Sequence, residues 1–226
     1  MSASDRRRAV GVFGGTFNPV HIGHLRTAVE LRQLLKLDEM RLIPCALPPH
    51  RQDPEIQSPG VNSGHRMGML RAAVFGEAGL VVDDRELRRA EFDGQPSYTV
   101  DTLRELRAEL GPEVAICLCI GMDSLLTLST WHRWEELLDY VHVVVAARPG
   151  WHAPDGCEVD LWVKRHQAES LGDLNQLPSG RVWLAQMTLL PISSTEIRKS
   201  LMEGESVRYL LPDSVIDYIN RNGLYQ

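Results

Sequence analysis

An α/β fold is predicted, a doubly wound parallel sheet with helices on both faces. Three observations predict it. Short apolar runs typical of buried strands alternate along the chain with segments whose apolar residues recur at helical spacing. The 226 residues can bury one sizeable core, and 43% hydrophobic with 24% charged residues is ordinary for a globular protein. No internal repeat or clear linker interrupts the pattern, so we expect one domain over residues 1–226.

The alternation can be followed in order along the chain. Strands are expected at residues 9–13, 39–45, 80–84, 113–120, 141–147 and 181–187. Helices are expected over residues 23–35, 65–78, 97–110, 132–140, 194–204 and 212–223. Residues 46–64 and 151–160 are rich in turn-forming residues and are expected to be loops, with helical character over 161–171. The 151–180 segment is interpreted as an insertion, and lid, interface and plain insertion remain open as its role.

Charge, hydropathy and cysteine usage exclude several classes of protein. The formal net charge of −6 gives no global attraction for nucleic acid. No apolar run approaches the roughly 18 residues that a membrane span needs, and the N-terminus lacks an apolar signal core, so we expect a cytoplasmic protein without a membrane partner. Cys117 and Cys119 are expected to be buried core residues, since neither zinc spacing nor a disulfide framework is present.

The stretch "GVFGGTFNPVHIGHL", residues 11–25, is the first candidate for chemistry. Gly14 and Gly15 remove Cβ atoms where the chain leaves the first strand, which permits a sharp turn and a close approach to a ligand. The next helix is expected to begin between Asn18 and Gly23. Its first N–H groups lack partners within the helix, so this end of the helix suits an anion.

His21 and His24 lie three residues apart in that entry turn and can point into one pocket. A neutral ring N–H donates to a phosphoryl oxygen, and nearby phosphates would raise the pKa of the ring and favour the stronger charged bond. One alternative is a solvated or buried histidine with no ligand. The other is a metal site completed by His50 or His65, although zinc without a cysteine or carboxylate ligand would be unusual.

The place of binding is predicted by topology. Ligands of open α/β sheets bind beyond the carboxyl ends of the strands. Four segments that follow predicted strands carry glycine, proline, hydroxyl or charged residues and are expected along that edge: residues 14–24, 121–124, 148–150 and 191–198.

A second candidate is "ISSTEIR", residues 192–198. Ser193 followed by Glu196 predicts a capping box at the start of a helix. The exposed N–H groups of that turn, with the hydroxyls of Ser194 and Thr195, can bind phosphate, and Arg198 lies within reach two turns on. A capping box alone indicates only a helix start.

Together these stretches resemble the nucleotidyltransferase superfamily with its T/HxGH signature. "HIGH" is also an aminoacyl-tRNA synthetase signature, but no KMSKS stretch is present and the chain is short for such an enzyme. Over nearly its whole length the chain resembles bacterial nicotinate-nucleotide adenylyltransferase. This resemblance rests on "GGTFNPVHIGHL", "PPHR" (48–51), "SYTVDTL" (97–103), "GMDSLLTLSTWHRW" (121–134), "RPG" (148–150), "ISSTEIR" and "LLPDSVIDYI" (210–219). It implies a Rossmann-like sheet of nucleotidyltransferase type.

The resemblance also implies substrates, a cofactor and roles. The substrates would be ATP, with Mg²⁺ on its phosphates, and nicotinate mononucleotide, and no protein residues would serve as a metal cage. The implied ATP contacts are the Gly14–Phe17 backbone with Thr16, His21, His24, Gly121, Asp123, Arg148, Ile192, Ser193, Ser194 and Arg198. The implied mononucleotide contacts are Arg51 on its phosphate, Thr99 on the nicotinate carboxylate, and Trp131 with His132 at the pyridine ring.

Each implied role has a structural alternative. Asp123 could cap a helix, Thr99 could be a helix-start residue, Trp131 could be core like Trp134, and Arg51 could be solvated. Asn18 stands where relatives often have Asp, which removes a charge but keeps a helix cap, and His132 stands where some carry Tyr.

Catalysis is expected to be positioning and charge neutralisation, because the 5′-phosphate of the mononucleotide is already a nucleophile. We expect His21, His24 and Arg198 to stabilise the charge that grows on the α-phosphoryl group and on the departing pyrophosphate. The alternatives are an adenylyltransferase that prefers nicotinamide mononucleotide or another phosphate acceptor, and a nucleotide sensor without catalysis. The sequence does not give the oligomeric state.

Overall fold

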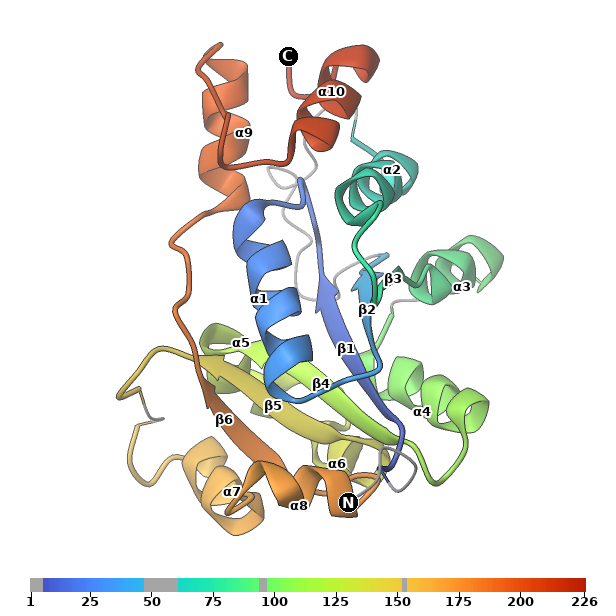
Figure 1. Cartoon of the computed structure of the whole chain (residues 1–226), viewed down its shortest axis with the longest axis vertical. Coiled ribbons are helices and arrows are strands. Elements are labelled where there is room, and N and C mark those ends of the chain that lie inside the picture. The colour runs from blue at the N-terminus through green and yellow to red at the C-terminus, as the bar shows by residue number, and fades with distance from the viewer. Residues whose placement is uncertain (1–5, 47–60, 94–96, 152–153) are drawn as a thin grey trace. The chain divides into compact units, whose positions relative to one another are not determined.

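The computed structural model of the chain describes residues 6–46, 61–93, 97–151 and 154–226. Its strands form a six-stranded parallel sheet in the order β3-β2-β1-β4-β5-β6, flanked by helices, as predicted (Figure 1). The order reverses between β1 and β4, the topological position at which sheets of this class bind ligands. The strands are β1 (Ala9–Gly15), β2 (Glu39–Pro44), β3 (Leu80–Val82), β4 (Ala115–Gly121), β5 (His142–Ala147) and β6 (Val182–Gln186).

The helices connect these strands in chain order. They are α1 (Ile22–Leu34), α2 (Ser63–Val74), α3 (Arg85–Asp93), α4 (Thr99–Leu110), α5 (Met122–Leu126), α6 (Leu137–Tyr140), α7 (Glu158–His166), α8 (Leu171–Gln176), α9 (Ser194–Met202) and α10 (Asp213–Asn222). Two 3₁₀ turns, Leu128–Thr130 and Trp134–Glu136, precede α6.

The chain divides into two compact units, each built from three stretches of sequence. Unit 1 consists of Met1–Phe13, Glu30–Arg41 and Tyr98–Leu189, and unit 2 of Gly14–Val29, Leu42–Ser97 and Leu190–Gln226. Each unit is described by itself below. The single domain expected over residues 1–226 stays a prediction.

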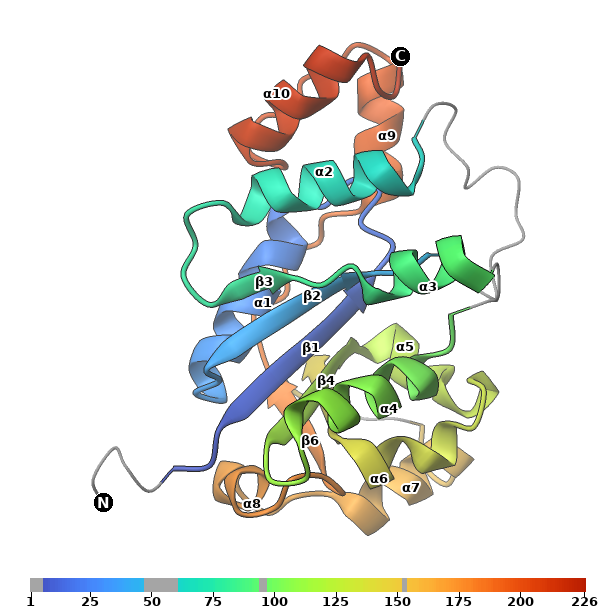
Figure 2. The same cartoon turned by 90° about the vertical axis from the view of Figure 1, so that its right-hand side faces the viewer.

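Unit 1 holds the part of the sheet that runs from β1 to the edge strand β6. β1 pairs with β4, β4 with β5 and β5 with β6, all in parallel, with Gly121 opposite Ala146 near the carboxyl ends. Val10, Ile116 and Val144 are fully buried, as expected for strands covered on both faces. Figure 2 shows α4, α5 and α6 gathered beside β4 and β5. At the other end of the strands, the guanidinium of Arg107 donates to four backbone carbonyls, those of Tyr140, Gly111, Val114 and Pro178.

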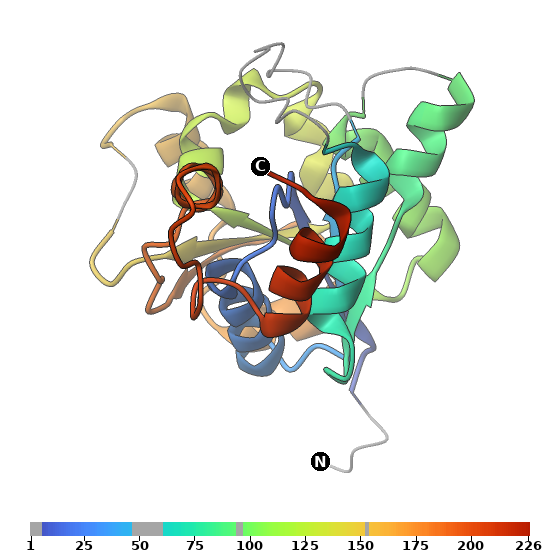
Figure 3. The same ribbon diagram turned by 90° about the horizontal axis from the view of Figure 1, so that it is seen from above.

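Unit 2 is built around two helices that lie side by side, α2 and α10 (Figures 2 and 3). The hydroxyl of Ser214 donates to the carbonyl of Ala72 at 2.9 Å, and the hydroxyl of Tyr218 lies 3.3 Å from Nδ1 of His65. A Cβ on Gly68 would approach the Tyr218 hydroxyl to 2.3 Å, so this close helix packing requires glycine. After α10 follow Leu224 and Tyr225, two of the last three residues of the sequence, and both are buried.

The six expected strands and most expected helices are confirmed, and the differences have physical reasons. Helix α3 was not expected, because six of the nine residues of "RELRRAEFD" are charged. α5 and α8 have five and six residues and are too short to show a helical period. The helix expected over 132–140 is instead a 3₁₀ turn followed by α6, because Arg133 adopts a left-handed conformation with φ of 53°. α7 begins at Glu158, inside the loop expected over 151–160.

Two predictions about buried and apolar segments can be compared with the structure. Cys117 and Cys119 are buried free thiols, as expected. Burial raises the pKa of Cys117 to about 12, so this thiol stays protonated and inert. Among the described residues, no helix has the length and hydropathy required to cross a bilayer.

Candidate active site

The turn that follows β1 is held by a tightly packed aromatic ring. Phe17 is buried in a left-handed conformation with φ of 49°. A Cβ on Gly15 would lie 3.0 Å from two atoms of the Phe17 ring, so glycine at position 15 allows the ring to fold back against the strand end. Gly14 is exposed and Thr16 is half-buried. The turn therefore places backbone, rather than side chains, at the carboxyl end of β1.

His21 and His24 cap the helix that they begin. The backbone N–H of His24 donates to Nδ1 of His21 at 3.3 Å, and the backbone N–H of His21 donates to Nδ1 of His24 at 3.4 Å. This is the reciprocal pattern of a capping box, with two imidazoles in place of the usual hydroxyl and carboxylate. The two rings stack with centroids 3.6 Å apart and planes 22° apart. The helix starts at Ile22, within the predicted interval.

The reciprocal cap fixes the protonation of both rings. Because each Nδ1 accepts a backbone N–H, neither Nδ1 carries a proton, and each neutral ring carries its proton on Nε2. Burial lowers the pKa of His21 to about 4. Burial, and then the charge of His21, lower that of His24 to about 3. Both rings are therefore neutral at pH 7 in the ligand-free protein, each with an Nε2–H that can donate to an anion.

Gly23 leaves room for this arrangement. A Cβ at position 23 would lie 3.0 Å from Nδ1 and 3.1 Å from Cε1 of the His21 ring, and 3.5 Å from Cβ of Ile192. Contacts of 3.0–3.1 Å require the ring to move. Position 23 therefore favours glycine for a steric reason. The 3.5 Å distance also shows that Ile192 lies next to the cap.

The start of α9 meets this turn although it lies far along the chain. The hydroxyl of Ser194 donates to the carbonyl of Pro19 at 3.0 Å, across 175 residues. Nη1 of Arg198 donates to the carbonyl of Asn18 at 2.8 Å, across 180 residues, and Nη2 donates to the Thr195 hydroxyl at 3.3 Å. The two motifs that the sequence analysis singled out are therefore adjacent within unit 2. Their roles toward phosphate stay predictions.

The expected helix start at Ser193 is confirmed, with a different cap. Its hydroxyl accepts from the backbone N–H of Thr195 at 3.2 Å, one residue earlier than in a capping box with Glu196. A reciprocal box of the hydroxyl–carboxylate kind forms instead between Ser170 and Asp173 at α8. Spacing alone could not distinguish the two, because both serines are followed by an acidic residue three positions on.

Asn18 does not cap α1, contrary to expectation, because the His21 ring takes that place. The side-chain oxygen of Asn18 accepts from the hydroxyl of Tyr225, and both residues are buried. Nη1 of Arg66 donates to the carbonyl of Thr16 at 2.8 Å. Neither Arg66 nor Tyr225 was predicted from the sequence to belong to the site. The sequence "HRMGML" places Arg66 at the start of an apolar helix face, which could have indicated a buried arginine. It could not show that the carbonyl of Thr16 accepts from this arginine.

In unit 1, the residues implied at the adenosine follow neighbouring strands. Gly121 ends β4 and Arg148 follows β5, and the ladder pairs Gly121 with Ala146, so both leave the sheet at the carboxyl ends. Asp123 is exposed in the first turn of α5, whose N-cap residue is Gly121 without a side-chain hydrogen bond. The alternative that Asp123 serves only as a helix cap is therefore not supported.

The two segments implied at the pyridine ring also meet in unit 1. The rings of Tyr98 and His132 lie with centroids 4.3 Å apart. Thr99 is the first residue of α4, and its neighbour Tyr98 is the N-cap residue. Trp131 is half-buried and ends a 3₁₀ turn, whereas Trp134 is buried and packs edge-on against Trp162, 5.5 Å away. The distinction expected between these two tryptophans is seen, and a half-buried Trp131 keeps surface for a ligand.

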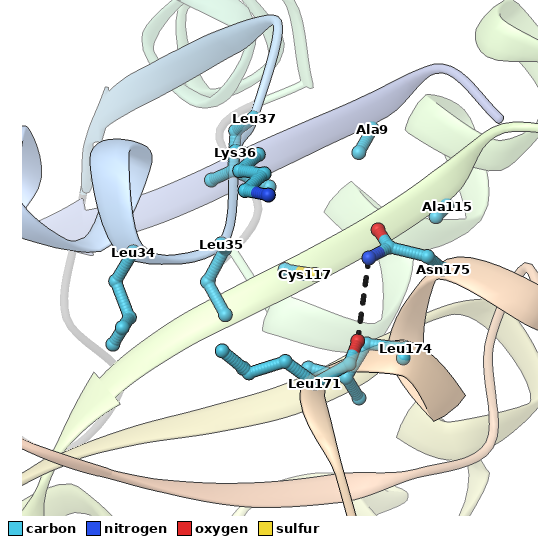
Figure 4. Close-up of a pocket in the computed structure, with 11 residues that line it drawn as sticks. Ala9, Leu34, Leu35, Lys36, Leu37, Ala115, Cys117, Leu171, Leu174 and Asn175 are labelled. Carbon is cyan, nitrogen blue, oxygen red and sulfur yellow. Dashed lines mark hydrogen bonds between the residues drawn. The ribbon is translucent and has the colours of Figure 1, made fainter. Parts of the chain in front are cut away.

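Arg51 and His50 lie outside the described residues. His65, the other candidate for a metal ligand, has its Nδ1 next to the Tyr218 hydroxyl. A cavity of about 260 Å³ lies in unit 1 near the first residues of β1 and β4, at the opposite ends of these strands from their carboxyl ends (Figure 4). Leucines dominate its wall, and the Asn175 amide in it already donates to the carbonyl of Leu171 at 3.3 Å. We assign no nucleotide to this cavity.

The chain is similar to known proteins over most of its length. The family model described as cytidylyltransferase-like matches residues 12–200. A probable nicotinate-nucleotide adenylyltransferase of Aeromonas hydrophila is 48% identical over 217 residues, which are 96% of this chain and 97% of that protein. A protein of the same description from Cellvibrio japonicus is 47% identical over 97% of this chain and 100% of its own length.

A solved structure shares the fold. The Plasmodium falciparum nicotinic acid mononucleotide adenylyltransferase complexed with NaAD superposes with a TM-score of 0.66, at 18% identity, over 97% of this chain and 98% of that one. At this level of identity the likeness shows the fold alone.

Proposed function

This chain belongs to the family of nicotinate-nucleotide adenylyltransferases, and we propose which of its residues carry the reaction of that family. It transfers the AMP moiety of ATP to nicotinate mononucleotide, which gives nicotinate adenine dinucleotide and pyrophosphate, a step in NAD biosynthesis. The observation that carries the assignment of residues is the hydrogen bonding of Ser194 and Arg198 to the Asn18–Pro19 turn beside the two capping histidines.

The triphosphate of ATP is held by unit 2 in our proposal. The Nε2–H groups of His21 and His24 donate to phosphate oxygens, and the Arg198 guanidinium supplies a fixed positive charge. Backbone N–H groups of Gly14–Phe17 and the Ser194 hydroxyl add neutral donors, with Ile192 and Ser193 at the adenine. Once phosphates are bound, their negative charge raises the pKa of both rings and strengthens these bonds as charge moves to the leaving pyrophosphate.

No side chain needs to act as nucleophile or base. One oxygen of the mononucleotide 5′-phosphate attacks the α-phosphorus of ATP in line, the bond from that phosphorus to the bridging oxygen breaks, and pyrophosphate leaves with the electron pair. Mg²⁺ enters as part of the substrate, on the phosphates of ATP. In the described parts of the chain, no group of three His, Cys, Asp or Glu side chains is placed to hold a metal ion.

Unit 1 supplies the other contacts that we propose. Gly121 and Asp123 meet the ribose of ATP, and Arg148 borders the adenine. Thr99 with nearby N–H groups reads the nicotinate carboxylate, and Trp131 with His132 contacts the pyridine ring. A flat ring stacked on tryptophan gains roughly 0.5–1.5 kcal/mol beyond burial. Arg51, which belongs to unit 2 and lies outside the described residues, completes the proposed set at the mononucleotide phosphate.

A pyrophosphate-release assay tests the function. The protein is mixed with MgATP and either nicotinate mononucleotide or nicotinamide mononucleotide, in separate reactions. We expect pyrophosphate in stoichiometric amounts with the dinucleotide and a higher kcat/KM for the acid. A higher kcat/KM for the amide would identify nicotinamide mononucleotide as the preferred acceptor. Binding of ATP without pyrophosphate release in the presence of either acceptor would indicate a nucleotide sensor. A cytoplasmic location and the lack of a nucleic-acid partner remain predictions.

A further inference from the structure

The turn after β1 has its carbonyl groups occupied by donors from several elements. The carbonyl of Gly15 accepts from the backbone N–H of Cys45 at 2.9 Å, and that of Thr16 accepts from Arg66. The carbonyls of Asn18 and Pro19 accept from Arg198 and Ser194. In a planar trans peptide the C=O of one residue and the N–H of the next point in opposite directions. Securing the carbonyls of Gly15 and Thr16 therefore turns the N–H groups of Thr16 and Phe17 the other way.

Arg66 is a buried cation held by carbonyl oxygens. Its side chain belongs to α2 and is 7% exposed, and its guanidinium donates to the carbonyls of Thr16, at 2.8 Å, and Ala46, at 3.4 Å. Neither Arg66 nor Arg198 forms an ion pair with a carboxylate anywhere in the described ranges. A buried charge without a counterion is costly for stability. The positive charge of Arg66 is thus left uncompensated next to the turn, where it favours an anion.

Tyr225 secures the same turn from the chain's last residues. Its buried hydroxyl donates to the side-chain oxygen of Asn18, whose backbone carbonyl holds Arg198. Burial raises the pKa of Tyr225, so the hydroxyl keeps its proton and remains a donor. Because the Asn18 side chain is neutral, it accepts this hydrogen bond without neutralising the positive charges of Arg66 and Arg198.

We infer that Arg66 and Tyr225 are positioning residues for adenylyl transfer. They hold the Thr16–Asn18 turn in the conformation in which its N–H groups and Arg198 bind the phosphates of ATP. The inference rests on the proposed function, because it needs ATP at this turn. In this proposal neither side chain touches substrate, so neither is a catalytic residue. Both act through hydrogen bonds to Thr16 and Asn18, and the charge of Arg66 also attracts the phosphates from a distance.

Tyr225→Phe tests this inference, because it removes one hydroxyl and keeps the ring. Tyr218→Phe is the matched control, since it removes a hydroxyl from α10 that contacts His65 and not the turn. We expect Tyr225→Phe to lower kcat/KM for MgATP about tenfold, with KM for nicotinate mononucleotide unchanged within about twofold. Tyr218→Phe should change neither constant beyond about twofold. Arg66→Lys, which keeps the charge but loses the planar fork, should lower kcat/KM for MgATP by about 10–100-fold.

Three outcomes decide the matter. The inference is overturned if Tyr225→Phe matches Tyr218→Phe in all kinetic constants, or if it only lowers the midpoint of thermal unfolding. A folded Arg66→Lys protein with unchanged kcat/KM for MgATP would overturn the role of Arg66. If Arg66→Lys does not fold, the inference stands or falls on Tyr225→Phe. If the wild-type protein releases no pyrophosphate, the proposed function fails by itself. Calorimetric binding of MgATP then judges the inference, with about tenfold weaker binding by Tyr225→Phe supporting it and equal binding overturning it.

Discussion

At the scale of single residues, the two histidines of the entry turn act first on the protein itself. Each Nδ1 accepts the other residue's backbone N–H, so the cap of α1 and the Nε2–H tautomer have one cause. The sequence predicted the pair and its position at the helix start. It could not predict that both rings serve as caps, because histidine is not a usual N-cap residue and the pattern depends on the glycine between them.

The lowered pKa values of these rings predict a pH dependence of stability. In the folded protein His21 and His24 lose their protons near pH 4 and pH 3, whereas in the unfolded chain they do so near pH 6.5. Between those values the unfolded state binds more protons, so the free energy of unfolding falls as the pH is lowered from about 6.5 to about 4. The contribution of His21 is on the order of 3 kcal/mol.

Urea unfolding of the ligand-free protein at pH 7, 6, 5 and 4 measures this loss. The double variant His21→Gln/His24→Gln serves as control, since carboxylates titrate in the same way in both proteins. A shallower decline in the variant is expected. Identical declines in the two proteins would show that the rings are not responsible.

Replacement of His24 by alanine removes one donor to the phosphates. We expect kcat to fall by about 10²–10³, the effect of losing a donor to developing negative charge. His166→Ala provides the control, because His166 lies in α7 with its ring near Trp162 and has no proposed role. Pyrophosphate release by both variants is compared at equal folded fraction, and full activity of a folded His24→Ala protein would refute the role.

Replacement of Trp131 by alanine separates the two substrates. If Trp131 stacks on the pyridine ring, its loss should raise KM for nicotinate mononucleotide by about tenfold and leave KM for MgATP within about twofold. Initial rates with each substrate varied in turn give both constants. An equal rise in both would count against stacking and favour a general disturbance of the 3₁₀ turn.

Arg66 and Tyr225 show where reasoning from sequence ends at this scale. An arginine in a helix is ordinarily solvated, and a tyrosine at a chain end has no pattern around it. Their importance appears only when the fold brings them to carbonyl and amide oxygens that are 50 and 207 residues away. Pairings of that range depend on how the elements pack, which no local spacing encodes.

At the scale of elements, period and turn residues predicted all six strands and the main helices. The elements that were missed are short or rich in charge. α5 has five residues and α3 has six charged residues among nine, so neither carries enough apolar residues to show a clear period. Cap type was also beyond prediction, since Ser193 and Ser170 look alike in sequence and cap differently. Helix starts were predicted more reliably than the hydrogen bonds that make them.

A test at this scale uses Gly23, the second residue of α1. Alanine there favours the helix by up to about 1 kcal/mol, but its Cβ would meet the His21 ring at 3.0 Å. We expect Gly23→Ala to lower kcat by about tenfold or more through displacement of that ring. Gly64→Ala in α2 is the matched control, because Gly64 is also a second helical residue and its Cβ would meet only Asn62 Oδ1, at 3.2 Å. Unchanged kcat in Gly23→Ala would contradict the steric account.

At the scale of the whole molecule, the chain brings segments from both ends of the sequence to one site. Asn18 and Arg198 are 180 residues apart and hydrogen-bonded. The parallel sheet follows from the alternation of elements, and ligands of such sheets bind beyond the carboxyl ends of the strands, so the place of binding could be proposed from the sequence. The order of the strands could not. The choice between nicotinate and nicotinamide mononucleotide depends on a few hydrogen-bond donors around one carboxylate. The sequence does not show where these donors lie, and the assay with the two acceptors measures the preference.

We propose that the segment after β1 and the start of α9 bind the polyphosphate as one unit. A double-mutant cycle of His24→Ala and Arg198→Ala tests this claim most directly. The measurement is kcat for pyrophosphate release at saturating MgATP and nicotinate mononucleotide. Residues that act as a unit are not additive, so each single variant should lose about 10²-fold or more and the double variant little beyond the worse single one. Losses that multiply in the double variant, or a folded Arg198→Ala protein with full activity, would contradict the claim.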